Sequence, residues 1–158
     1  MISLKKKKMA RKKTLKYYEA VGRRKEATAR VRLYITRGNK PVKVGDQEIK
    51  KGEIVVNGKP IEKIYPHKWE KNIYLKPLKL TKCEDRFAIS VKVKGGGKTG
   101  QLDAVVLGLA RALEKVDREA YRPVLKKEGL LTRDPRVRER RKVGTGGKAR
   151  REKQSPKR

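Results

Sequence analysis

The residues best suited to bind a ligand are the cations of the last segment, 132–158. This segment carries twelve Lys or Arg residues against three acids, a net charge of +9. Each cation that neutralises a phosphate releases condensed counterions, so such a segment suits a nucleic acid. Its only aliphatic side chains larger than Ala are Val137 and Val143, and it has no aromatic residue. We therefore expect an arm that is disordered alone, becomes ordered along a polyanion, and recognises backbone charge more than bases.

Residues suited to catalysis are few. The chain has one histidine, His67, and one cysteine, Cys83. A thiol and an imidazole can form a nucleophile–base pair, but nothing around either residue resembles an activated site. A single cysteine cannot form an intrachain disulfide, which fits a reducing compartment, and it has no second thiol nearby to complete a metal site. We predict no enzyme activity, no cofactor and no metal site.

A glycine run at 95–97, followed by Lys98 and Thr99, resembles a phosphate-binding loop between a strand and a helix. The P-loop motif needs another glycine five residues before the last one, where this chain has Lys92, so the motif fails. Two interpretations remain: a sharp strand-to-helix turn, and a helix N-terminus at which Lys98 contacts a nucleic-acid phosphate. We favour the turn, with some phosphate contact.

Charge is concentrated at the two ends of the 158-residue chain. The net charge is +30, of which residues 1–16 contribute +8 and residues 17–131 contribute +13. A solvated surface would explain one lysine run or the basic turn at 22–25. A solvated surface does not explain the whole net charge, because repulsion among so many cations destabilises the compact state unless a polyanionic partner neutralises them. We predict a disordered arm over 1–16, a globular RNA-binding domain over 17–131 and an extended basic tail over 132–158.

Membrane insertion and export are not indicated. No apolar run approaches the roughly 20 residues that a membrane-spanning helix needs. The N-terminus has no hydrophobic signal core before its lysine run. We therefore expect a soluble, cytoplasmic protein.

Apolar alternation predicts the strands that position these cations. We expect a short strand over 17–21 that Gly22 ends, and a longer strand over 27–35. In the longer strand, Ile35 belongs to the apolar side and Tyr34 to the basic outer side. Further strands are expected over 42–44, 54–56 and 86–94, the first of them in a small hairpin or a long loop.

Periodicity of three to four residues predicts the helices. A short helix over 61–65 has Pro60 at its first position, whereas 67–84 suits either a helix or an extended segment. The best-defined helix starts near Thr99, and another starts near Asp117 with a break at Pro123 and a stop at Gly129. The helix near Thr99 carries one apolar stripe: Leu102, Val105, Val106, Leu109, Leu113 and Val116.

This order of elements predicts an α/β (α+β) fold. The expected architecture is a two-layer sandwich of a mostly four-stranded sheet with helices on one face. RNA or DNA is expected on the exposed basic surfaces, since the outer strand faces carry cations.

Several segments, taken in order from about residue 18 to the end, resemble the universal ribosomal protein nine family of the small subunit. Each motif is weak alone, but their order makes the resemblance specific. The segments are Gly22-Arg23-Arg24-Lys25, Val56-Asn57-Gly58-Lys59-Pro60, Lys94-Gly95-Gly96-Gly97, Leu131-Thr132-Arg133-Asp134-Pro135-Arg136, Glu139-Arg140-Arg141-Lys142 and Lys148-Ala149-Arg150-Arg151.

The resemblance implies a structural constituent of the small-subunit head, bound to ribosomal RNA beside neighbouring head proteins. It implies neither a membrane partner nor a small-molecule substrate. It also implies a left-handed βαβ crossover and a tail whose last residues, Lys157 and Arg158, contact the phosphates of peptidyl-site tRNA. The residues then expected to contact ribosomal RNA are Arg23, Arg24, Lys25, Arg30, Lys98, Arg133, Arg136, Arg140, Arg141, Lys142, Lys148, Arg150 and Arg151.

Four features depart from the bacterial pattern of that family, and one of them is Gly144-Thr145-Gly146-Gly147, which replaces a less flexible stretch. The final Ser155-Pro156-Lys157-Arg158 lacks the aromatic residue that many bacterial members carry just before their last residues. The segment 36–52 is longer than the usual bacterial connection, and the lysine-rich residues 1–16 are additional. An architectural DNA-binding protein is the alternative, because charge alone does not separate RNA from DNA.

Overall fold

A five-stranded sheet organises the protein. The computed structural model describes residues 16–36, 41–44, 47–141 and 143. The sheet order is β1-β2-β7-β5-β6, with β5 parallel to β7 and the other neighbours antiparallel. The strands are β1 (Tyr17–Arg24), β2 (Ala27–Ile35), β5 (Ile54–Val56), β6 (Lys59–Pro60) and β7 (Phe87–Lys94). The predicted mostly four-stranded sheet is confirmed, with a two-residue fifth strand at its edge.

The first strand does not end at Gly22, as predicted, but continues to Arg24. A Cβ at Gly22 would lie 1.9 Å from the carbonyl oxygen of Ala104 and 2.4 Å from the amide nitrogen of Gly108. The glycine is therefore needed for close approach of a helix rather than for a turn. The turn follows at Lys25, whose φ is 50°.

The two faces of the sheet are covered differently. Ala29, Val31 and Leu33 of β2 are buried against the helices on the inner face. On the outer face, a hairpin of β3 (Val42–Val44) and β4 (Gln47–Ile49) forms a second, smaller apolar cluster with Tyr34. Of the two alternatives expected here, the structure shows the hairpin and not the long loop. The expected burial of the last two β2 residues is reversed: Tyr34 is 3% exposed and Ile35 is 52% exposed.

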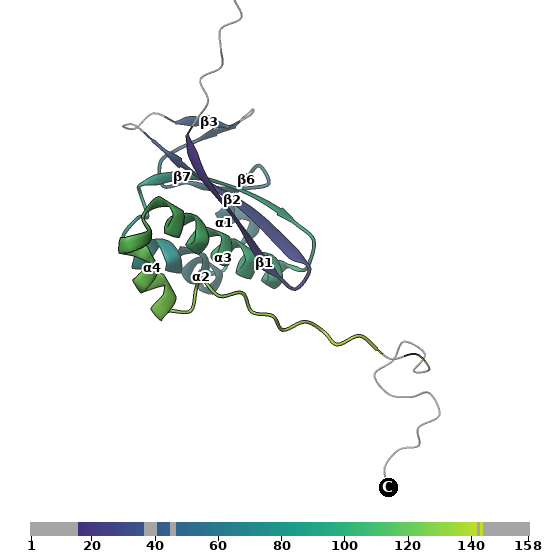
Figure 1. Ribbon diagram of the computed structural model, residues 1–158. Helices are drawn as coiled ribbons and strands as arrows, with labels where there is room; N and C mark the ends of the chain where they lie inside the picture. Colours follow the sequence, from purple (N-terminus) through teal and green to yellow (C-terminus); the bar gives the residue numbers. More distant parts are fainter. Residues whose placement is uncertain (1–15, 37–40, 45–46, 142, 144–158) are drawn as a thin grey trace, which may run out of the picture.

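All of the helices lie on one face of the sheet (Figure 1). The longest, α3, packs on β1 and β2, and its predicted apolar stripe is buried, with Val116 at the margin. The segment left open over 67–84 forms α2, which packs on α3. The helices are α1 (Ile61–Ile64), α2 (Lys68–Leu80), α3 (Lys98–Val116) and α4 (Arg118–Lys127).

Two proline predictions need correction. Pro60 precedes α1 as its N-cap instead of occupying the first helical position. Pro123 lies inside α4 without breaking it. The carbonyl of Glu119, one turn earlier, loses its helical donor there, but Glu119 is exposed, so water can solvate that carbonyl. The helix ends at Lys127, and Gly129, with a φ of 68°, follows as the predicted stop.

The parallel pair β5 and β7 forms the ends of a βαβ unit, with α1 and α2 in the connection. The handedness of that unit remains a prediction from the resemblance. No helix in the described part of the chain is long and apolar enough to span a membrane.

The edge strand β1 is covered by side chains from α3. The Nη1 of Arg111 donates a hydrogen bond to the carbonyl of Val21 at 3.2 Å, and the Nζ of Lys115 donates to that of Glu19 at 2.7 Å. An unprotected edge strand presents free backbone groups to other chains. These two cations occupy two such carbonyl groups of β1.

Candidate nucleic-acid interface

A row of cations crosses the outer face of the sheet. The strand register places Arg30 of β2 directly opposite Lys92 of β7, and Thr28 opposite both Arg23 and Lys94. Arg23, Arg30, Lys92 and Lys94 are all exposed. Like charges directly opposite each other across two strands destabilise a sheet. This arrangement therefore suits the binding of an anion better than it suits the stability of the isolated domain.

Arg30 and Lys92 border a hollow of about 670 Å³ that residues of the β3–β4 hairpin also line. Two amides in its lining are already bonded: Asn57 Nδ2 donates to the carbonyl of Val93 at 3.0 Å, and Gln47 Nε2 donates to the carbonyl of Gly58 at 2.7 Å. The groups best placed to meet a ligand there are consequently Arg30 and Lys92.

Arg32, the next outward-facing cation of β2, is already paired. Its Nε lies 2.5 Å from Oε2 of Glu19, and its guanidinium lies 4.7 Å from the centre of the Tyr17 ring. The hydrogen bond to Glu19 raises the pKa of Arg32 above its ordinary value. Arg32 therefore contributes less unpaired charge to the outer face than Arg30 does.

Lys92 and Lys94 were not among the predicted RNA-contacting residues. The alternation of β7 placed both on the outer side, but an outward lysine alone does not distinguish a binding surface from a solvated one. The distinguishing signal is their register against Thr28 and Arg30, which requires the pairing of strands far apart in the sequence.

The predicted pair Arg23 and Arg24 divides between two faces. Arg23 is exposed on the outer face, whereas the side chain of Arg24 is 13% exposed on the inner side of β1. Arg24 Nη2 lies 3.1 Å from Asp134 Oδ2, its Nη1 donates to the carbonyl of Arg136 at 2.5 Å, and its Nε lies 3.5 Å from Asp103 Oδ2. Arg24 is thus placed to anchor the root of the tail, while Arg23 is placed to meet a ligand.

The tail leaves this anchor as an extended segment (Figure 1). Asp134 also holds Arg136, whose Nε and Nη2 lie 3.0 and 2.7 Å from Asp134 Oδ2, and this hydrogen bonding is the main cause that lowers the pKa of the Asp134 carboxyl. Arg133, Arg140 and Arg141 are exposed. Six predicted contacts lie outside the described residues: Lys142, Lys148, Arg150, Arg151, Lys157 and Arg158.

The glycine run before α3 forms a sharp turn. Gly95 and Gly96 have φ values of 74° and 66°, and a Cβ at Gly96 would lie 2.8 Å from that of Ala27. This geometry supports the turn interpretation. Lys98 begins α3 and is about half exposed, with its Nζ 3.5 Å from Oε1 of the buried Glu70. It therefore balances a buried carboxylate in addition to any contact with phosphate.

His67 and Cys83 have separate surroundings. His67 is exposed and caps α2, whereas Cys83 is buried, with its Sγ 3.2 Å from the hydroxyl of Tyr121. The hydrogen bond with Cys83 is the main cause that raises the pKa of Tyr121. No group of three or more potential metal ligands occurs in the described ranges.

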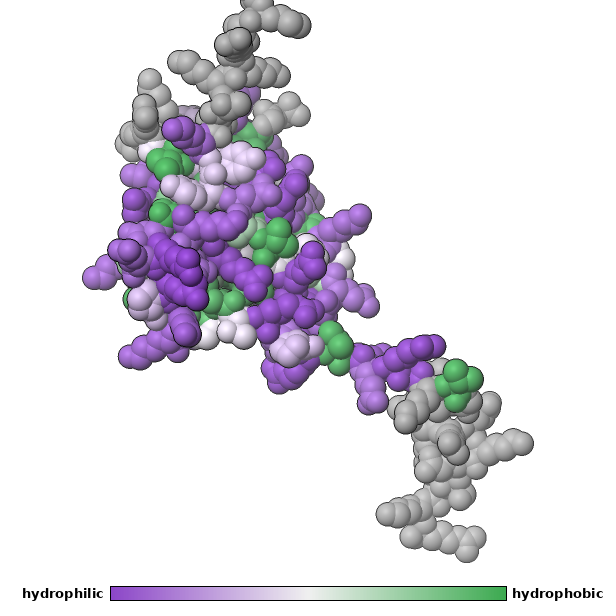
Figure 2. All heavy atoms as spheres, viewed as in Figure 1, coloured by the Kyte–Doolittle hydropathy of each residue, from purple (hydrophilic) through white to green (hydrophobic). Residues whose placement is uncertain are grey.

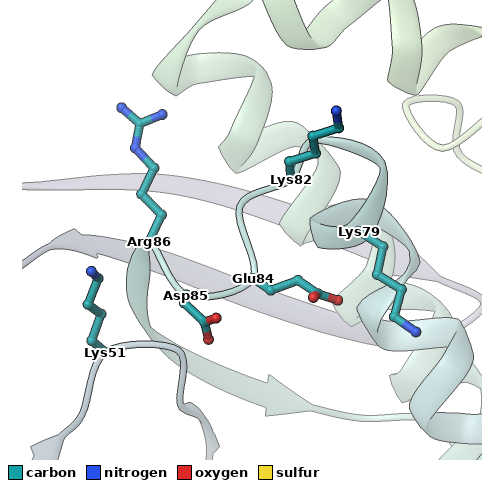
Figure 3. A pocket seen from close by; sticks show the side chains of 6 residues that line it. All are labelled: Lys51, Lys79, Lys82, Glu84, Asp85 and Arg86. Carbon is teal, nitrogen blue, oxygen red and sulfur yellow. The ribbon is translucent and has the colours of Figure 1, made fainter.

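A second hollow, of about 560 Å³, has mixed charge. Figure 3 shows Glu84 extending toward Lys79, with Asp85 on the side nearer to Lys51 and Arg86. Two carboxylates among the cations weaken the attraction for phosphate. Hydrophilic side chains also cover most of the face seen in Figure 2, so polarity alone does not mark the interface.

Comparison with known proteins identifies the relatives of this chain. Residues 22–158 match the family model described as ribosomal protein S9/S16. A small ribosomal subunit protein uS9 from Maridesulfovibrio salexigens is 47% identical over 128 residues, which cover 81% of this chain and 87% of that protein. The uS9 proteins of Dehalococcoides mccartyi and Chlorobium limicola are 45% and 44% identical, covering 81% and 80% of this chain and 86% of each relative.

Proposed function

The chain belongs to the ribosomal protein S9 family, and from this premise we propose that it binds small-subunit ribosomal RNA through two basic surfaces. One is the outer face of the sheet, and the other is the C-terminal tail, whose end contacts peptidyl-site tRNA. As a member of the family it is a structural component of the small ribosomal subunit and not an enzyme. Its place in the cell is the ribosome, which is cytoplasmic in bacteria.

The observation that carries the RNA-binding proposal is the position of Arg30 directly opposite Lys92 on neighbouring strands. Both are exposed, and their register holds two like charges side by side in the middle of a rigid sheet. Backbone phosphates of RNA would relieve this repulsion and release counterions. The sheet surface would recognise the shape and charge of folded RNA, because the groups best placed to meet a ligand there are the cations Arg30 and Lys92.

The anchor at Asp134 supports the second surface. Arg24 and Asp134 fix where the tail leaves the domain, so the exposed Arg133, Arg140 and Arg141 start from a defined point. An arm anchored at its root loses less entropy on binding than one that is free throughout. The contact of Lys157 and Arg158 with tRNA rests on the family resemblance and on their charge. The neighbouring head proteins complete the proposed surroundings.

Sedimentation of a cell lysate tests the choice of polyanion. The protein should migrate with small ribosomal subunits, and purified protein should bind naked small-subunit ribosomal RNA with strong salt dependence. Migration with the nucleoid and absence from small subunits would instead support a DNA-binding protein.

The tRNA contact has its own experiment. Purified small subunits carrying full-length protein are compared with subunits whose protein ends at Lys153, by measuring peptidyl-site tRNA affinity across a salt series. A matched variant, Lys157→Gln with Arg158→Gln, keeps the length and removes the charge. Weaker affinity and a shallower salt slope in both variants are expected. Unchanged affinity would show that the tail end does not neutralise tRNA phosphates.

A further inference from the structure

The start of α2 presents an aromatic surface to solvent. Trp69, the chain's only tryptophan, is 53% exposed in the first turn of this helix. The imidazole of His67 lies nearly parallel to the indole, with an interplanar angle of 10° and ring centres 6.3 Å apart. Tryptophan is enriched at interfaces because its indole offers a large apolar plane, so this exposed ring with its imidazole neighbour is a candidate contact site. We call Trp69 and His67 the aromatic platform.

The platform is held in place by a buried carboxylate. Glu70 is 3% exposed, and one of its oxygens accepts a hydrogen bond from the backbone N–H of His67 at 3.2 Å. Its other oxygen lies 3.5 Å from Nζ of Lys98. Glu70 thus joins the start of α2 to the start of α3, and the two rings stand on a fixed corner of the helical layer.

Two lysines lie at that corner. Lys68 is exposed beside the platform, and Lys98 is about half exposed at the first residue of α3. The described first turn of α3 contains no acid, and its N-cap, Gly97, has no side chain that could accept a hydrogen bond from the first N–H groups of the helix. An apolar plane flanked by cations fits an unpaired nucleotide, since bases stack on aromatic rings while their phosphates need positive charge.

We propose that the aromatic platform stacks an unpaired base of RNA, whose backbone phosphate lies toward Lys98. This inference rests on the proposed function, because it takes RNA as the partner. It adds a contact of another kind and in another place. The cations of the outer sheet face recognise backbone, whereas the platform lies in the helical layer (Figure 1) and recognises the plane of a base.

The single tryptophan makes the proposal measurable, since all indole emission arises at Trp69. Full-length protein is titrated with a short single-stranded RNA and with an RNA duplex of the same length. Stacking should quench the emission with the single strand and leave it nearly unchanged with the duplex. Unchanged emission with the single strand, in samples where filter binding shows the RNA bound, overturns the platform and leaves the proposed function standing.

Two substitutions separate base stacking from a simple apolar contact. Trp69→Phe keeps an aromatic plane and should bind single-stranded RNA within about twofold of the parent, whereas Trp69→Leu should bind about fivefold or more weakly. Melting curves confirm that both variants fold. Equal affinities, or a quench that appears only when neighbouring small-subunit proteins are added, would assign the platform to a protein and overturn the proposal. Failure of the parent protein to bind any RNA would remove the proposed function and this inference together.

Discussion

Arg24 in the first strand holds Asp134 at the root of the C-terminal tail, with Arg24 Nη2 3.1 Å from Asp134 Oδ2. The same guanidinium reaches Asp103 on α3 and the carbonyl of Arg136. One side chain therefore ties the sheet, a helix and the tail together. The neighbouring Arg23 points to the other face, and this division permits a matched comparison.

Replacing these two arginines separately should separate anchoring from RNA binding. Arg24→Ala should lower the melting temperature by a few degrees and speed proteolysis of residues 133–141, because it removes two ion pairs and the bond to the tail backbone. Arg23→Ala should leave both properties unchanged and weaken RNA binding. Equal protease sensitivity of the two variants would show that Arg24 does not anchor the tail.

The tail anchor should depend on pH in the acidic range. The carboxyl of Asp134 has a pKa below its ordinary value of 3.8, chiefly because Arg136 donates side-chain hydrogen bonds to it. Because this pKa is lowered in the folded state, the ionised Asp134 stabilises the folded protein fully at pH above 3.8. This stabilisation is lost as the pH falls through the lowered pKa. Carbon NMR of this carboxyl should show the pKa rising strongly in Arg136→Ala and less in Arg24→Ala. An unchanged pKa in Arg136→Ala would contradict the assigned cause.

The contact of β1 with α3 predicts opposite effects for two glycines. Gly22→Ala should destabilise the domain by about 3 kcal/mol or more, because the new Cβ overlaps backbone atoms of α3 that cannot move independently. Gly100→Ala, within α3, places its Cβ 3.6 Å from the carbonyl oxygen of Arg24, an ordinary contact distance, and should stabilise the domain by about 0.5–1 kcal/mol. Urea unfolding measures both. A tolerated Gly22→Ala would mean that the helix lies farther from the strand.

The outer face of the sheet should contribute to the salt dependence of RNA binding. Arg30→Ala and Lys92→Ala should each weaken binding and reduce the slope of log affinity against log salt by about one unit, without lowering stability. Lys126→Ala removes an exposed cation from α4 and serves as the control. A slope that Lys126→Ala changes as much as Arg30→Ala does would show that binding follows total charge and not this surface.

Local pattern was sufficient for elements whose signal lies within their own residues. The stripe of α3, the alternation of β7 and the stop at Gly129 each follow from near neighbours, and the structure confirms them. For the segment 67–84 the sequence did not decide between a helix and an extended segment, so neither α2 nor the exposure of Trp69 was predicted. Its apolar residues suit two periodicities, so the direction of the indole followed only from packing on α3.

Other errors arose where a distant element decides a residue's role. The residues next to Gly22 in the sequence suggest that a strand ends there. The structure shows instead that Ala104 and Gly108 of α3 approach it too closely for a side chain. Tyr34 is buried because the β3–β4 hairpin covers it. The sequence pattern presents Arg24 as a free phosphate ligand, but the structure pairs it with Asp134. It also places the carboxylate of Glu70 beside Lys98, which stays about half exposed. The sequence therefore predicted that the interface is basic. The structure shows which of the described cations are paired with acids and which are free to meet a ligand.

The covering of β1 by α3 has a consequence for the isolated protein. A chain with a net charge of +30 and exposed strand edges would precipitate readily once polyanions screened its repulsion. Arg111 and Lys115 instead occupy carbonyl groups along that edge and place ammonium and guanidinium charge where a second chain would dock. The same contacts therefore disfavour strand-to-strand association of β1 with a second copy of the protein.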